Sequence, residues 1–530
     1  QKEWESTYKF RHDVCGRRLH THQLCLPAPA PRGSPAQDDR NFKNSVEAVK
    51  EPMKSDIRFI REGKELSWKQ RLRLTVSLSL PAMLAQLSSI AMQYIDASMV
   101  GRLGADDSAS IGLVSTSLWL FWGICSAMTS GYSVQVAHRV GAKDNEGARR
   151  VLRQGITASL TFSILTALIG VAIALPLPHW LGGGETICPK ASLYFVVFVA
   201  ALPLLTMNYL AGGMLRCVGN MKIPSLLSGM MCVLDCIFNF LLIFPSHHYD
   251  LSGIHVTIPG AGLGVLGAAL GTVAAEAVCA VIMMYYACVR QPELRIWKTK
   301  GSFRPTSGIT RKAASISAPM TLEHAVICGA QIAITMIVAP LGVIAIAANA
   351  FAVTAESLCY MPGYGIGDAA TALTGQSHGA DRPGLVRQFG YMAVGLGMAV
   401  MSAMGVLMYM FSYEIMAAIT PVEAIRELGA EVLRIEAWAE PMFAASIVAY
   451  GVFVGVGNTT LPAVMNFGSI WAVRVPLAWL FAKSMGLQGV WTAMCIELIF
   501  RGSIFLARLF FSRWYHPRKQ EHTDPASVIT

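Results

Sequence analysis

Charged residues are scarce in this sequence. Asp, Glu, Lys and Arg make up only 14% of the 530 residues, whereas hydrophobic residues make up 53%. Soluble domains usually carry about 25% charged residues. This shortage excludes an ordinary water-soluble fold and predicts a protein whose main solvent is the lipid bilayer.

Signatures of nucleotide and metal chemistry are also missing. The sequence contains no G-x-x-x-x-G-K-[ST] phosphate loop, no metal-ligand cluster and no soluble catalytic domain. We therefore predict no cofactor, no certain metal site and no enzymatic activity, and energy from ATP would need a separate subunit. The 12 cysteines predict no disulfide framework, because most lie inside apolar runs and only Cys188 lies in a predicted outside loop.

Long apolar runs recur throughout the chain. A helix needs roughly 20 mostly apolar residues to cross the bilayer, and only closed hydrogen bonding is tolerated there. We predict twelve such spans, near 74–100, 109–137, 156–176, 191–215, 223–245, 261–289, 314–339, 343–374, 390–411, 432–456, 461–482 and 486–512.

Basic residues lie in alternate loops between these spans. They crowd the segment before the first span, the loop near Arg139–Arg153 and the loop near Arg290–Lys312. The positive-inside rule places such loops in the cytoplasm. We therefore expect a cytoplasmic (inner) membrane protein with both termini inside, and we attribute the net charge of +10 to topology rather than to nucleic-acid binding.

An internal repeat organises the chain. The run around Pro81 recurs around Pro319, and the same offset of 238 residues pairs Pro203 with Pro441. Each copy contains six predicted spans, so the copies cross the membrane in the same sense. The predicted fold is an all-α integral membrane protein whose twelve transmembrane helices form two six-helix lobes.

The remaining segments complete the predicted organisation. The first methionine is Met53, which motivates the hypothesis that residues 1–52 are not native sequence. The predicted parts are a polar, disordered extension (1–70), the N-terminal lobe (71–290), a basic cytoplasmic linker (291–313), the C-terminal lobe (314–512) and a cytoplasmic tail (513–530).

Ionisable groups inside spans are the candidate site residues, because burying them in lipid is costly. Asp96 shares a helical face with Gln93 and Ser89, and this face can line a wet pocket. On the fifth span Asp235 and Asn239 are four residues apart and can approach Asp96. We predict that the acids bind an ion, which is either a proton or a sodium ion shared by Asp96 and Asp235.

The second half carries weaker candidates. Glu323 and Glu356 lie inside spans, and Gln331 is the repeat partner of Gln93. Glu436 and Asp368 lie towards the ends of their spans, where we expect them to be solvated.

Several motifs resemble the multidrug and toxic compound extrusion (MATE) family. They are YIDASMVGRLGADDSASIGL, VGAKDNEGARR, LRCVGNMKIP, TALTGQSHGAD and VGVGNTTLP, and the resemblance covers about residues 70–512. It implies two six-helix lobes and antiport of organic compounds against protons or sodium. Asp96 matches the family's coupling carboxylate on the first span.

The resemblance favours the proton-coupled bacterial branch. That branch places Asn before Asp on the fifth span, whereas here Asp235 precedes Asn239. The seventh- and tenth-span acids of the sodium-coupled branch are replaced by Ile327 and Phe443, so that sodium site is absent.

The predicted function is therefore ion-coupled export of small organic cations or amphipathic drugs by a monomer in the bilayer. The first alternative is a flippase for a lipid-linked saccharide, although basic residues are scarce in these spans. The remote alternative is an intramembrane protease, because Gly365, Gly367 and Asp368 spell G-x-G-D, but the preceding spans lack its partner Asp.

Overall fold

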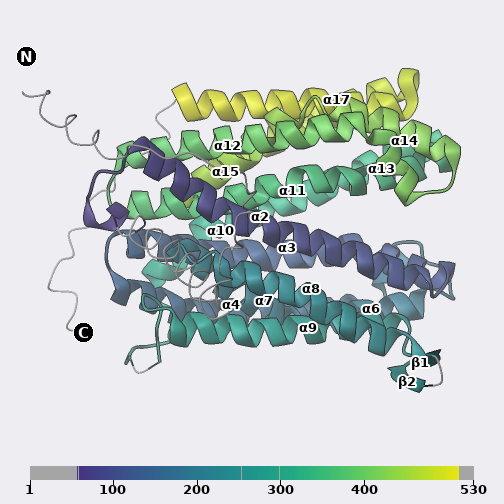
Figure 1. Ribbon diagram of the computed structural model, residues 1–530, viewed down its shortest axis with the longest axis horizontal. Helices are drawn as coiled ribbons and strands as arrows, with labels where there is room; N and C mark the ends of the chain where they lie inside the picture. The colour runs from purple at the N-terminus through teal and green to yellow at the C-terminus, as the bar shows by residue number, and fades with distance from the viewer. Residues whose placement is uncertain (1–56, 58, 252–253, 298, 512–530) are drawn as a thin grey trace, which may run out of the picture. The chain divides into compact units, whose positions relative to one another are not determined.

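The computed structural model describes residues 57, 59–251, 254–297 and 299–511, and most of them are helical (Figure 1). The elements of the first half are α2 (Trp68–Gly101), α3 (Ala105–Gly141), α4 (Asn145–Ile173), α5 (Leu177–Trp180), α6 (Cys188–Ala200), α7 (Leu202–Val218), α8 (Lys222–Ile243), β1 (Pro245–Leu251), β2 (Ile254–Ala261), α9 (Val265–Tyr285) and η1 (Tyr286–Arg290). Those of the second half are α10 (Ser307–Val338), η2 (Ala339–Leu341), α11 (Val343–Gly379), α12 (Pro383–Met410), α13 (Ser412–Ile419), α14 (Glu423–Glu436), α15 (Glu440–Gly455), α16 (Thr460–Ser469), η3 (Ile470–Arg474) and α17 (Val475–Phe511).

These helices provide twelve membrane spans. Eight are single helices that are long and apolar enough to cross a bilayer. Two more are bent pairs, α6 with α7 at 44° and α14 with α15 at 61°. The last two are α16 with η3 and the start of α17, and the part of α17 after Gly486. Gly486 interrupts α17 with a non-helical φ of 61° and ψ of −137°. The predicted fold of two six-helix lobes is confirmed.

The internal repeat extends to the backbone conformation. Gly219 ends α7 with φ 94°. Gly457, which lies 238 residues later, follows α15 with φ 80°. The same offset joins Lys143 and Asp381, with φ 61° and 54°, which are the only described non-glycine residues with positive φ. Left-handed backbone is unfavourable for side chains other than glycine. The same unusual turns therefore follow corresponding helices in both halves.

A β-hairpin distinguishes the first half from the second. Strands β1 and β2 pair antiparallel between α8 and α9, with Pro245 opposite Ala261 and Leu251 opposite Ile254. The second half has no strand among its described residues.

The chain enters the first span through a capped helix. Ser67 Oγ accepts from the Gln70 amide at 3.3 Å, while the Gln70 side chain accepts from the Ser67 amide at 2.8 Å. This reciprocal pair is a capping box, which satisfies two donors that a helix start would otherwise leave unpaired. Pro81 lies within α2, where it removes one backbone hydrogen bond.

The segment before α2 packs against both halves. Ile57, Ile60 and Leu66 are buried in a cluster with Met221 of the first half and residues of α11 and α12 in the second. The prediction that all of 1–70 is a disordered extension is therefore wrong for the described residues after 56. These three apolar side chains are spaced so that they face the protein, a pattern hidden in an otherwise polar stretch.

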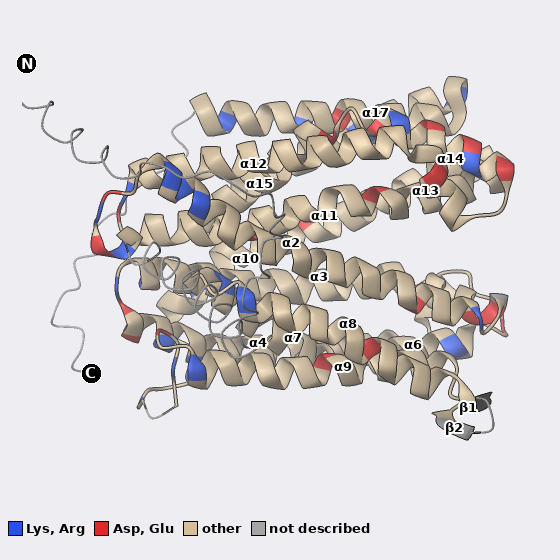
Figure 2. Ribbon diagram, viewed as in Figure 1, with Lys and Arg blue, Asp and Glu red and all other residues tan. Residues whose placement is uncertain are grey.

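Hydrogen bonds join the two halves at the end where α3, α7, α11 and α15 finish, which we call the basic end (Figure 2). His138 Nε2 donates to the Gly455 carbonyl at 2.8 Å, and Gln376 Nε2 donates to the Cys217 carbonyl at 2.8 Å. Towards the opposite end, the Tyr94 hydroxyl donates to the Thr354 carbonyl at 3.0 Å. The halves are thus linked at more than one level.

Candidate functional site

Three polar side chains meet inside the N-terminal lobe. Asn239 Nδ2 donates to Asp96 Oδ1 at 2.8 Å and to Asp235 Oδ2 at 3.0 Å. Asp235 and Asn239 are one turn apart on α8 and share a face. The structure therefore brings together the three residues that the sequence singled out, and we call them the acid cluster.

The acid cluster is closed on one side and open on the other. Asp235 and Asn239 are 0% and 1% exposed, whereas Asp96 is only half-buried. Asp235 Oδ1 and Asn239 Oδ1 have no hydrogen-bond partner among the described residues. Two carboxylates joined by one amide repel each other, and a proton or a cation between them relieves that repulsion. The cluster therefore has donors suited to H⁺ or Na⁺.

No larger metal site accompanies this cluster. Within the described ranges, no group of three or more His, Cys, Asp or Glu side chains is arranged to hold a metal ion. Sodium could use the two carboxylates and the free amide oxygen of Asn239, which are hard oxygen ligands. A transition metal has no such set of ligands here.

A second buried acid of this lobe was missed by the sequence analysis. Glu276 on α9 is 4% exposed and accepts a hydrogen bond from Asn208 Nδ2 at 2.7 Å. Its position inside the apolar run 261–289 was a readable signal. Gly271, one and a half turns earlier, lies against Asn239 so closely that any side chain would collide with its amide oxygen. This close approach packs α9 behind the acid cluster.

The predicted supporting residues do not join the cluster. Ser89 Oγ donates to the Ala85 carbonyl of its own helix at 3.1 Å. Gln93 is exposed, and no hydrogen bond connects it to another described residue. Ser89, Gln93 and Asp96 do share a helical face. The acids, however, receive their hydrogen bonds from Asn239 of α8 instead.

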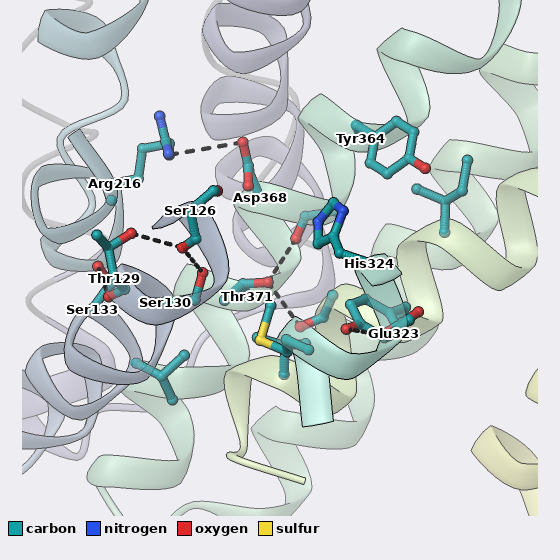
Figure 3. Close-up of a pocket in the computed structure, with 18 of the residues that line it drawn as sticks. Ser126, Thr129, Ser130, Ser133, Arg216, Glu323, His324, Tyr364, Asp368 and Thr371 are labelled. Atoms are coloured by element: carbon teal, nitrogen blue, oxygen red, sulfur yellow. Dashed lines mark hydrogen bonds and ion pairs between the residues drawn. The ribbon is translucent and has the colours of Figure 1, made fainter. Parts of the chain in front are cut away.

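A cavity of about 330 Å³ lies between the two lobes (Figure 3). The first half contributes side chains from α3 and α7, and the second half contributes side chains from α10, α11 and later helices. Its polar lining residues include Ser126, Thr129, Ser130, Ser133, Arg216, Glu323, His324, Asp368, Thr371, Tyr450, Asn466 and Arg501.

An ion pair crosses this cavity from one lobe to the other. Arg216 Nε of α7 lies 3.7 Å from Asp368 Oδ2 of α11. The prediction that Asp368 is solvated near the end of its span is incomplete, since it lies in the cavity opposite a cation. Basic residues are scarce in the predicted spans, but two basic residues, Arg216 and Arg501, line the cavity.

Glu323 lies on the second-lobe side of the cavity. It is 8% exposed, the Tyr450 hydroxyl donates to its Oε2 at 2.5 Å, and Asn466 Nδ2 donates to its Oε1. Its neighbour His324 packs closely on Gly123 of the first lobe, where a Cβ atom would lie 2.6 Å from His324 Nδ1. Glu323 is therefore a hydrogen-bonded acid at the interface between the lobes.

Three further acids of the C-terminal lobe are sealed inside it. Glu356 is 5% exposed, and Glu436 and Glu440 are both 0% exposed. Both carboxylate oxygens of Glu436 and of Glu440 lack a hydrogen-bond partner among the described residues. The prediction that Glu436 is solvated is wrong, because the bend between α14 and α15 turns it into the core. Gln331, in contrast, is exposed on α10 and bonds to none of these acids.

Helix α2 connects the acid cluster to the cavity. The Gln86 side chain of α2 lies near Asp368. Asp96 is ten residues further along the same helix, which corresponds to about 15 Å at 1.5 Å per residue. A ligand in the cavity and an ion at the acid cluster therefore do not compete for the same atoms.

One known family matches both copies of the internal repeat. The MatE family matches residues 81–241 and 319–480, two segments that start 238 residues apart. The probable multidrug resistance protein NorM of Thermotoga maritima is 25% identical over 449 residues, which cover 83% of this chain and 92% of that protein. The protein of the same name from Bradyrhizobium diazoefficiens is 27% identical over 447 residues, covering 82% and 92%.

Solved structures share the fold at low sequence identity. A mutant of the MATE transporter VcmN of Vibrio cholerae superposes with a TM-score of 0.75 at 19% identity, covering 83% of this chain and 96% of that one. A MOP superfamily transporter from Pyrococcus furiosus gives 0.77 at 19% identity, covering 86% and 96%.

Proposed function

Since this chain belongs to the MatE family and is a secondary transporter rather than an enzyme, we propose that it exports small organic compounds in exchange for protons. The relatives are named as multidrug resistance proteins, which supports cationic or amphipathic compounds as the class exported. Membership of this family rules out the intramembrane protease alternative. That alternative would also need a second acid beside Asp368, and among the described residues the partner of Asp368 is Arg216.

The observation that carries this proposal is the acid cluster. One amide, Asn239, bridges two carboxylates of different helices, and Asp96 is the member that is only half-buried. A proton that binds at Asp96 removes one negative charge and changes which hydrogen bonds the cluster prefers. Sodium at Asp96 and Asp235 is the alternative coupling ion.

Coupling then passes along α2 rather than through direct competition. We propose that protonation at Asp96 repacks α2 against α8, and that this movement reaches the cavity at Gln86 and Asp368. Each ligand must bind the two states with different affinity for coupling to occur. One charge that moves through 100 mV supplies about 2.3 kcal/mol, which sustains roughly a fifty-fold gradient.

The proposed orientation follows the basic loops. We place the basic end in the cytoplasm, with both termini on that side of the cytoplasmic membrane, since Lys and Arg concentrate there. The working unit is a monomer, because each chain already contains both lobes and the cavity between them.

The flippase alternative is not favoured by the cavity. A lipid-linked saccharide with a diphosphate would need cationic residues with no acid beside them, because a carboxylate next to the cation repels the diphosphate. Arg216 faces Asp368, and Arg501 Nε lies 3.1 Å from Glu497 Oε1. Each arginine of the cavity therefore already has an acidic neighbour.

The test is transport by the purified chain in liposomes. We would impose either a proton or a sodium gradient and follow efflux of a fluorescent organic cation for wild type, Asp96→Asn and Asp106→Asn. Asp106 is an exposed acid in the first turn of α3, so its variant controls for the loss of one charge near the same end of the lobe.

We expect proton-driven efflux in wild type and Asp106→Asn, and its loss in Asp96→Asn. Sodium-driven efflux that is indifferent to Asp96→Asn would refute the proton mechanism and direct attention to Glu323 and Glu356.

A further inference from the structure

The ion pair between Arg216 and Asp368 is loosely made for one inside a membrane protein. Its N–O distance of 3.7 Å is too long for a hydrogen bond, and the side chains remain 29% and 38% exposed (Figure 3). The Arg216 guanidinium makes no hydrogen bond to another described residue. Both groups therefore keep hydrogen-bonding capacity that a ligand in the cavity can use.

A wall of hydroxyl groups lies beside this pair. Ser126, Thr129, Ser130 and Ser133 follow one face of α3 and line the cavity. Thr129 and Ser130 donate to the Ser126 carbonyl at 2.8 and 3.2 Å, and Ser133 donates to the Thr129 carbonyl at 3.1 Å. Because these hydroxyl protons are engaged by the backbone, the oxygen lone pairs are what the wall offers to a ligand. Lone pairs suit a ligand that donates, such as an ammonium group.

The other charged residues of the cavity are already satisfied. Glu323 accepts from Tyr450 and Asn466, and Arg501 is paired with Glu497. Among the described lining residues, the loosely paired charges are thus one cation and one anion. A ligand of a single sign would occupy one of them and leave the other without its partner, which is costly in a partly buried site.

We propose that Arg216 and Asp368 recognise a small zwitterion that carries both a carboxylate and an ammonium group, as in the α-amino acid class. The carboxylate binds the guanidinium, whose planar donors match its two oxygens. The ammonium binds Asp368 and the hydroxyl oxygens of α3. The cavity of about 330 Å³ is at the lower end of the 300–1,000 Å³ typical of ligand sites, which suits a metabolite-sized compound.

This inference rests on the proposed export function and narrows its substrates. The organic cation expected from the relatives is here one whose positive charge is accompanied by a negative one.

The experiment compares three probes of nearly equal size on the purified full chain by isothermal titration calorimetry. They are phenylalanine, its amide and N-acetylphenylalanine, which are a zwitterion, a cation and an anion. We expect wild type to bind phenylalanine at least about tenfold more tightly than either derivative, or about 1.4 kcal/mol.

Two variants should reverse this preference in opposite directions. Asp368→Asn leaves Arg216 alone and should favour N-acetylphenylalanine, whereas Arg216→Gln leaves Asp368 alone and should favour the amide. Each variant's gain for one probe also shows that it remains folded.

Other outcomes would overturn the inference. They are a wild type that prefers the amide, a wild type that binds none of the probes, or variants that weaken all three equally, as a purely structural ion pair would. If proton-driven efflux of the fluorescent cation succeeds while the probe pattern is absent, this inference alone fails. If the pattern is present but efflux fails, the site stands and the proposed function fails.

Discussion

The two lobes bury their acids in different ways although they share one fold. In the N-terminal lobe, Asp96 and Asp235 share the Asn239 amide at 2.8 and 3.0 Å, and Asp96 is half-buried. In the C-terminal lobe, Glu436 and Glu440 are 0% exposed, and their carboxylate oxygens have no hydrogen-bond partner among the described residues. Asp96 and Asp235 thus have a shared donor and one half-exposed member, whereas Glu436 and Glu440 have neither.

This difference bears on the proposed coupling site, because burial alone does not distinguish the acid cluster from Glu436 and Glu440. A group that carries ions must exchange them with water during each cycle, and it needs partners that stabilise both of its states. The acid cluster meets both conditions through Asp96 and Asn239. The sealed pair Glu436 and Glu440 meets neither in this structure, despite having the deeper burial that usually marks functional acids in membranes.

The largest effect should come from removing the shared donor. Asn239→Leu keeps both carboxylates but leaves them without the amide that bridges them. A hydrogen bond to a charged group is worth about 1.5–3 kcal/mol, so we expect proton-driven efflux to fall by roughly 10- to 100-fold. The measurement is the liposome assay under a proton gradient.

The matched variant in the other lobe is Asn466→Leu, which removes the amide donor to Glu323. The comparison predicts that its proton dependence stays as in wild type, since Glu323 keeps the Tyr450 hydroxyl. An equal loss of proton coupling in both variants would break the comparison and make the lobes functionally alike.

Much of the fold could be predicted from the sequence because lipid imposes strict rules. Helices must close their own hydrogen bonds, so apolar runs give the spans, and the offset of 238 residues gives the two lobes. The hairpin at 245–261 could not be predicted in this way, because it lies in a polar loop. The packed segment with Ile57 and Ile60 was hidden for the same reason, since its few apolar residues gain their partners only from distant helices.

The candidate site could be predicted where its geometry depends on spacing along one helix. The spacing of Asp235 and Asn239 sets their shared face, and the approach of Asp96 follows from neighbouring spans. Contacts between lobes were not predictable, so the pairing of Arg216 with Asp368 was missed. The burial of Glu436 also depends on a bend of 61° that the sequence does not reveal.

A smaller effect, on stability rather than on transport, should appear where the segment before α2 joins the lobes at the basic end. Arg61 donates to Glu293 at 2.8 Å, and also to Gln376 of α11 at 3.2 Å. Burial of Glu293 opposes its charge, but the hydrogen bond and charge of Arg61 outweigh this and hold the pKa of Glu293 below its ordinary value. A lowered pKa means that ionised Glu293 stabilises the fold when the pH is above the ordinary pKa of a glutamate. That contribution is lost as the pH falls through the lowered pKa of the folded protein.

We therefore expect Arg61→Gln to reduce stability by about 1.5–3 kcal/mol at pH 7 and by less below pH ~4. Thermal unfolding in detergent at both pH values measures this. Lys64→Gln is the control, because its ion pair with Glu62 is exposed and is worth under about 1 kcal/mol. A loss in Arg61→Gln that does not depend on pH would mean that the contact with Glu293 is not what links the segment to the lobes.

The smallest effect on transport should come from the acids that are most deeply buried. Glu436→Gln and Glu440→Gln replace carboxyl groups to which no described residue donates a hydrogen bond, so the variants lose a burial cost rather than an interaction. We expect proton-driven efflux within about twofold of wild type and a melting temperature that is equal or higher, since replacing buried acids that lack partners is often neutral or stabilising. Efflux and thermal unfolding of the double variant measure this together. If efflux is lost while the protein still melts as wild type does, the sealed acids must open to water during the cycle, and the C-terminal lobe then carries ions in a state other than this one.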